Sequence, residues 1–124
     1  MSGPRERMQA ALEAIVAGHK LLGAALISRD GLCVSALGRL DMNRETFSAM
    51  SATVMGAAEI ALGELQGGAT RSIVASTDRA TMVLIGVSSD LILVGYAPAE
   101  ASVADVLHGL ESAAKDVARA ALEG

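Results

Sequence analysis

Three side chains in this sequence are of types that perform nucleophilic or acid–base chemistry: Cys33, His19 and His108. A cysteine hydrolase needs a thiol activated by a nearby base, and a zinc site needs ligands at a spacing such as Cys-x-x-Cys. Cys33 follows a tight-turn signal within an apolar segment, which predicts a buried and inert thiol. His108 lies three residues after Asp105, the spacing of a surface pair on a helix. We predict no catalytic residue, metal site or cofactor, and keep a cysteine hydrolase as a distant alternative.

The segment Gly67-Gly68-Ala69-Thr70-Arg71 superficially resembles a phosphate-binding loop. It lacks the Gly-Lys-Ser/Thr ending and precedes a predicted strand instead of a helix, so we interpret it as a helix stop. Arg29, Arg71 and Arg79 could each reach into the nucleotide of a partner GTPase. A solvated arginine at a turn or sheet edge is the simpler interpretation of each. The chain is therefore not predicted to be a GTPase itself.

Composition narrows the class of protein further. The chain has 124 residues, 52% of them hydrophobic, with Phe47 and Tyr96 as its aromatic residues and no Trp. This length predicts a single domain over residues 1–124, with a core of Ala, Val, Leu, Ile and Met. A net charge of -4 without a Lys/Arg stripe argues against nucleic acid. One cysteine, no signal peptide and no membrane-spanning segment lead us to expect a cytoplasmic protein.

Hydrophobic periodicity and turn residues divide the chain into eight elements. Met8, Leu12 and Ile15 recur at helical spacing, and Gly18 is a stop signal. Asp30-Gly31 between two apolar segments is a strong hairpin signal. Asn43 or Asp41 can cap a long helix. The predicted elements are a helix over 4–17, strands over 21–28 and 32–37, a helix to residue 66, strands over 70–76, 80–87 and 91–97, and a helix from Ser102.

The five strands are predicted to form one antiparallel sheet in the order 2-1-5-4-3. The first, fourth and fifth strands are apolar on both faces, so they belong inside the sheet and need cover from both sides. The second strand carries Ser35, and the third carries Arg71 and Ser72, which suits both strands to the sheet edges. This order also keeps each hairpin partner adjacent. We therefore predict an α+β sandwich, α-β-β-α-β-β-β-α, with helices on both faces.

The long helix has two apolar faces. At 100° per residue, a broad stripe collects on one side and is predicted to cover the sheet; it consists of Phe47, Val54, Ala58 and Leu65, flanked by Met50, Met55, Ala61 and Leu62. The opposite side is small and uncharged, and interior glycines there weaken a helix unless another helix approaches closely. We predict a homodimer interface on this side, continued by the third strand at an open sheet edge. Its residues are Ala49, Ala52, Thr53, Gly56, Ile60, Gly63, Arg71 and Ile73.

Two segments resemble the roadblock/dynein light chain family. Residues 24–32, AALISRDGL, are similar to its first hairpin, and residues 50–59, MSATVMGAAE, are similar to its second helix. Leu32-Cys33-Val34 follows the turn where dynein-associated members often have proline, so the chain looks more like the stand-alone prokaryotic members. The resemblance implies a profilin-like or longin-like sandwich, a homodimer with a sheet shared between two copies, and binding to Ras-like small GTPases. It carries no catalytic residue across.

Two functions of different classes follow. The first is a non-enzymatic homodimeric interaction module that binds a Ras-like small GTPase and regulates or scaffolds it. The alternative is a profilin-like regulatory domain that senses a small molecule, which would require a pocket with convergent polar groups. The sequence shows few inward polar candidates and almost no aromatic residues to line such a pocket. We therefore favour the interaction module.

Overall fold

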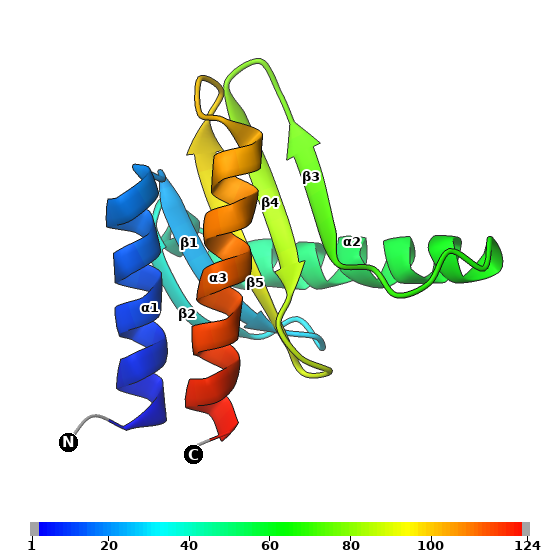
Figure 1. Cartoon of the computed structure of the whole chain (residues 1–124), viewed down its shortest axis with the longest axis horizontal. Helices are drawn as coiled ribbons and strands as arrows, with labels where there is room; N and C mark the ends of the chain where they lie inside the picture. Colours follow the sequence, from blue (N-terminus) through cyan, green and yellow to red (C-terminus); the bar gives the residue numbers. More distant parts are fainter. Residues whose placement is uncertain (1–2, 123–124) are drawn as a thin grey trace.

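The computed structural model describes residues 3–122, and the predicted order of elements is confirmed in that range (Figure 1). A short 3-10 turn, η1, precedes the long helix. The elements are α1 (Pro4–His19), β1 (Gly23–Ser28), β2 (Cys33–Gly38), η1 (Arg39–Asp41), α2 (Arg44–Glu64), β3 (Ser72–Ser76), β4 (Ala80–Gly86), β5 (Leu91–Pro98) and α3 (Val103–Leu122).

The strands form one antiparallel sheet in the order β2-β1-β5-β4-β3, as predicted. β1 lies between β2 and β5, so that Leu26 is opposite Ser35 on one side and Leu93 on the other. The first hairpin turns at Asp30-Gly31, where Gly31 has a φ of 95° that favours glycine. Polar residues thus mark the two edge strands, and the strands that are apolar on both faces lie inside.

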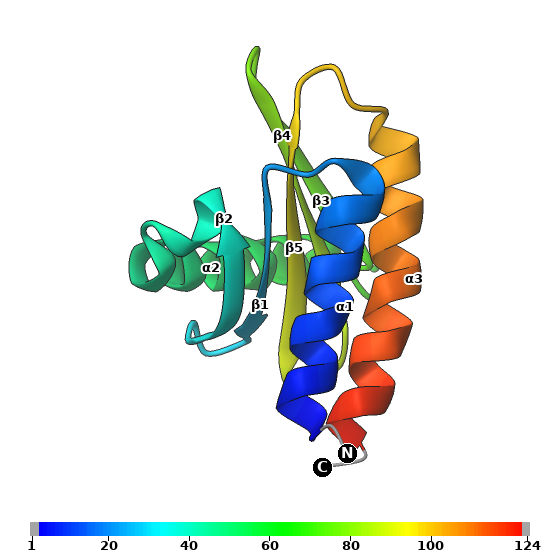
Figure 2. The ribbon, with the colours of Figure 1, turned by 90° about the vertical axis from the view of Figure 1, so that its left-hand side faces the viewer.

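Alternate residues of each inner strand face opposite helical layers. Ala24 and Leu26 of β1 belong to a core with α1 and α3, whereas Ala25 and Ile27 belong to a core with α2. Figure 2 shows α1 and α3 together on one side of the sheet and α2 on the other. The fully buried large side chains are mainly Leu, Ile, Val and Met. The aliphatic core is therefore confirmed, and Phe47 and Tyr96 are only half-buried.

Helix ends differ from the sequence expectations. Gly18 lies inside α1, and the left-handed position that ends the helix is Lys20, with a φ of 52°. Gln66 takes the corresponding position after α2, with a φ of 55°. The side chain of Asn43 makes no capping hydrogen bond at the start of α2. The Asp41 carboxylate instead accepts a hydrogen bond from Arg44 Nε at 2.8 Å, which raises the pKa of that guanidinium.

The face of α2 that packs on the sheet matches the predicted one only in part: Phe47 and Met55 pack against the core, but the packed face lies to one side of the predicted stripe. Ser48, Ser51 and Met55 are its buried residues, whereas Val54 and Leu65 of the predicted stripe are exposed. With 3.6 residues per turn, the buried residues are centred roughly 80° around the helix axis from the centre of the predicted stripe. The helix is therefore rotated about its own axis by this angle relative to the expected orientation. The small serines allow the helix axis to lie close to the strands, and Met55 fills the space between them. None of the helices in residues 3–122 is both long and apolar enough to span a membrane.

This orientation predicts opposite outcomes for two methionines on α2. Met55 is 1% exposed, so Met55→Ala should lower the free energy of unfolding by about 2–5 kcal/mol. Met50 is 56% exposed, so Met50→Ala should change it by no more than about 0.5 kcal/mol. Urea unfolding at one protein concentration measures both. Equal losses from the two substitutions would contradict the observed rotation of the helix.

Candidate interaction surface

The C-terminal half of α2 extends beyond the sheet. The helix runs across the strands and contacts β1, β2 and η1, and its later turns project past the sheet edge (Figure 1). Ile60 is 70% exposed and Leu65 is 78% exposed. Groups of exposed apolar side chains are characteristic of interaction surfaces in folded proteins, and here they lie on more than one side of the helix. The exposed large apolar residues of α2 and its C-terminal end are Met50, Val54, Ile60, Leu62 and Leu65.

The edge strand β3 lies beside this overhang. It pairs with β4 through five residues and has no partner on its other edge within residues 3–122. Ile73 is half-buried against the core on the α2 side, and Val74 is exposed. An edge of this kind presents unpaired backbone N–H and C=O groups, which another strand can bind. The overhanging helix and the open edge together form the candidate interaction surface.

The predicted dimer residues are exposed or half-buried, and none of them is fully buried. Thr53, Ile60, Gly63 and Arg71 are exposed, and the other four are not fully exposed, namely Ala49, Ala52, Gly56 and Ile73. A methyl group added at Gly56 or Gly63 would meet nothing within 4 Å. The two glycines therefore stand beside open space. No contact within residues 3–122 requires them to lack a side chain.

Ala49 is different because its own chain covers it. A Cβ added at Gly31, in the β1–β2 turn, would lie 3.2 Å from Ala49 Cα. The small side chain of Ala49 therefore allows the hairpin turn to approach the helix. Ala49, Gly56 and Gly63 are small residues spaced by seven along the helix. The packing against the hairpin turn explains Ala49 without a second chain, whereas no contact within residues 3–122 explains Gly56 and Gly63.

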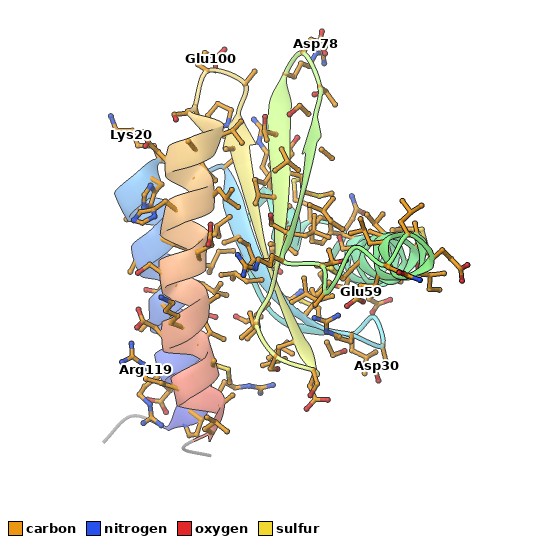
Figure 3. The ribbon with its side chains drawn as sticks, turned by 45° about the vertical axis from the view of Figure 1, so that its right-hand side comes forward. Lys20, Asp30, Glu59, Asp78, Glu100 and Arg119 are labelled. Atoms are coloured by element: carbon orange, nitrogen blue, oxygen red, sulfur yellow. The ribbon has the colours of Figure 1, made fainter. Side chains whose placement is uncertain are left out.

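Arg29 joins three parts of the fold that sequence analysis treated separately. Its Nη1 atom donates to Glu59 Oε2 at 2.8 Å, and its Nε donates to the carbonyl oxygen of Ser88 at 3.1 Å. The side chain thus links the β1–β2 turn to the C-terminal half of α2 and to the β4–β5 turn, and Figure 3 shows Glu59 close to the turn that carries Asp30. Glu59 is the single charged residue between Phe47 and Gly63 in the sequence, and this isolation was the signal for its ion pair with Arg29. Arg29 is therefore not a free arginine, whereas Arg71 and Arg79 are exposed.

The three chemically reactive side chains do not form a catalytic group within residues 3–122. Cys33 is half-buried on edge strand β2, which corrects the expectation of a buried thiol. The groove beside it is lined by residues of α1, β2 and the start of α2, none of which is histidine. His19 packs against Gly109 of α3, where an added Cβ would lie 2.3 Å from its Nε2, and His108 is exposed. Across the same described residues, no three His, Cys, Asp or Glu side chains are grouped as metal ligands.

No protein-family model matches the sequence, and no curated protein is significantly similar to it. Solved structures are similar in fold. A gliding protein, mglB, from Thermus thermophilus superposes with a TM-score of 0.89 and 20% identity, over 100% of this chain and 95% of that one. A structure described as MglB with tetrameric arrangement superposes with a TM-score of 0.88 and 24% identity, over 99% of this chain and 93% of that one. A roadblock/LC7 domain from Streptomyces avermitilis superposes with a TM-score of 0.84 and 23% identity, over 93% of this chain and 97% of that one. The fold of this chain is the roadblock/LC7 fold.

The roadblock/LC7 fold confirms the resemblance found in the hairpin and the second helix. A profilin from Schizosaccharomyces pombe is also similar, with a TM-score of 0.66 and 17% identity over 86% of this chain and 93% of the profilin. The expected profilin-like sandwich is thereby confirmed. The match to the MglB structures extends over nearly the whole chain, including the projecting part of α2.

The contact between Arg29 and Glu59 can be tested with two glutamates of the same helix. Glu59→Gln should lower the free energy of unfolding by about 1 kcal/mol, because the ion pair is only partly exposed to solvent. Glu64→Gln removes an exposed charge that has no ion pair within residues 3–122, and should change stability by less than about 0.5 kcal/mol. Thermal or urea unfolding of both variants provides the comparison. Indistinguishable values would show that the pair contributes nothing to holding α2 on the hairpin.

Proposed function

We propose that this chain is a single-domain, cytoplasmic, non-enzymatic module that forms a homodimer and binds a Ras-like small GTPase, which it regulates or scaffolds. The observation that carries the proposal is the uncovered apolar half of α2 beside the open edge of β3. In a chain with the roadblock/LC7 fold, this surface is suited to protein contacts, and its described residues offer no paired nucleophile and base for catalysis.

The glycines of α2 and the open edge of β3 favour contact with a second copy of the chain over exposure to solvent. Gly56 and Gly63 lie in the projecting helix next to open space, where each costs roughly 0.5–1 kcal/mol relative to alanine. Close approach of a second α2 offsets that cost, because backbones without side chains pack at short distance. A two-fold axis would bring the two β3 edges together at the same time, so both unpaired features would be satisfied by one symmetric contact.

Support for the GTPase partner comes from the family resemblance. The hairpin and helix segments resemble roadblock proteins, and that family implies binding to Ras-like small GTPases. The superposed structures include one described as an MglB with tetrameric arrangement, which is consistent with self-association among proteins of this fold. Binding of the GTPase is proposed to require the dimer, because two copies present a larger continuous surface than one.

The dimer can be tested by placing a charge on the glycine row of α2. Gly56→Glu should convert the dimer to monomer, because a carboxylate would be buried between two helices without a partner. Ala14→Glu, on an exposed position of α1 on the other face of the sheet, is the matched control and should leave the dimer intact. Sedimentation velocity ultracentrifugation measures the mass of each variant. A Gly56→Glu protein that sediments as an undisturbed dimer would exclude this interface.

GTPase binding can be tested by calorimetric titration against the Ras-like GTPases of the same cell, each loaded with GDP or a GTP analogue. We expect saturable binding that prefers one nucleotide state, and a loss of at least about tenfold in affinity for Gly56→Glu, since about 1.4 kcal/mol corresponds to tenfold. Ala14→Glu should bind as the unmodified protein does. The absence of binding in both nucleotide states would remove the proposed function while leaving the dimer unaffected.

A further inference from the structure

A groove lies between α3 and the adjoining ends of β3 and β4, away from the proposed dimer face of α2. We call it the α3–β4 groove; it has a volume of about 540 Å³, within the range of small-molecule sites. Its polar lining comes from the β1–β2 turn, the segment that leads into β3, and α3. The side chains that matter below are Arg29, Thr70, Arg71, Glu111 and Lys115.

Three cationic side chains from distant parts of the sequence converge on this groove. Arg29, Arg71 and Lys115 line it, with Glu111 as the one carboxylate among its lining residues. Arg71 and Lys115 are exposed, and neither forms an ion pair with any residue of 3–122. The chain as a whole carries a net charge of -4, whereas the residues that line this groove carry more positive than negative charges. Such a cluster favours an anionic ligand.

The groove is also built to hold hydrogen-bond donors in place. Arg29 is oriented by Glu59 and by the carbonyl of Ser88, and a Cβ at Gly86 would lie only 2.9 Å from Arg29 Nη2. The absent side chain at Gly86 therefore leaves room for the guanidinium at this wall. The hydroxyl of Thr70 is buried and has no hydrogen-bond partner among the described residues.

We propose that the α3–β4 groove binds a small phosphorylated molecule. Arginine forks and a lysine ammonium are the side chains that recognise phosphate oxygens. Small and apolar residues continue the groove beneath α3 and leave room for the organic part of the ligand; they are Ile85, Val87, Ala114 and Ala118. An acidic peptide is less well matched, because it would call for cations along an extended stripe, whereas these three line a single groove. This ligand would give the chain a sensing role in addition to GTPase binding, and its binding does not depend on that function.

Isothermal titration with pyrophosphate and with ADP tests the proposal on the purified chain alone. We expect saturable binding of ADP that pyrophosphate competes for. Lys115→Gln should weaken it by about tenfold or more, because a charge-assisted hydrogen bond is lost. Arg119→Gln is the matched control, since it removes the same charge four residues further along α3 and outside the groove. Because Lys115 is exposed, Lys115→Gln should fold as the unmodified protein does. Equal melting temperatures of the two proteins will show this.

A second pair of variants tests another cation of the groove, Arg71, which is also one of the predicted dimer residues; sedimentation velocity therefore accompanies the titration, to show whether Arg71→Gln remains a dimer. Arg71→Gln should weaken ADP binding as Lys115→Gln does, whereas Arg79→Gln, at the exposed tip of the β3–β4 hairpin, should not. Binding that persists equally in all four variants, or no binding of either phosphate compound, would overturn the proposal. So would Lys115-dependent binding of a hexaglutamate peptide without binding of ADP. Neither result would affect the test of GTPase binding, which uses other variants.

Discussion

The structure depends on one constraint: the inner strands of its sheet are apolar on both faces and must be covered from both sides. The helices α1 and α3 pack together and cover one face, with Leu12, Leu110 and Val117 buried against the sheet. On the other face α2 lies alone and contacts mainly β1, β2 and η1. Because α2 runs across the strands and past the sheet edge, its own later turns lie beyond the sheet and leave Ile60 and Leu65 exposed (Figure 1).

The residue types of α2 are consistent with a helix that packs on more than one side. Ser48 and Ser51 face the sheet, Ala49 lies beneath the β1–β2 turn, and Gly56 and Gly63 stand beside open space. Small side chains allow close approach on each of these sides, which aromatic side chains would prevent. The cores on both faces of the sheet are filled by Leu, Ile, Val and Met side chains, so the fold is packed without a buried aromatic ring.

Arg29 connects the two surfaces to which functions are assigned above. It pairs with Glu59 in the C-terminal half of α2, next to the candidate interaction surface, and it lines the α3–β4 groove. The candidate interaction surface and the α3–β4 groove thus share one side chain, whose Nη1 is held by Glu59 and whose Nη2 lies at the Gly86 wall of the groove.

The sequence by itself determined the element order, the strand order and the identity of the edge strands. These follow from local signals, namely alternation along each strand and turn residues such as Asp30-Gly31, and from the adjacency of strands that short turns join. The family resemblance added the profilin-like sandwich. Only the tertiary structure decided which side of α2 faces the sheet, because the helix is apolar on several sides and its periodicity leaves the rotation undetermined. The fit of Ser48, Ser51 and Met55 against the strands selects the rotation. The convergence of Arg29, Arg71 and Lys115 likewise requires the folded chain, since no spacing in the sequence relates a turn, a strand edge and a helix.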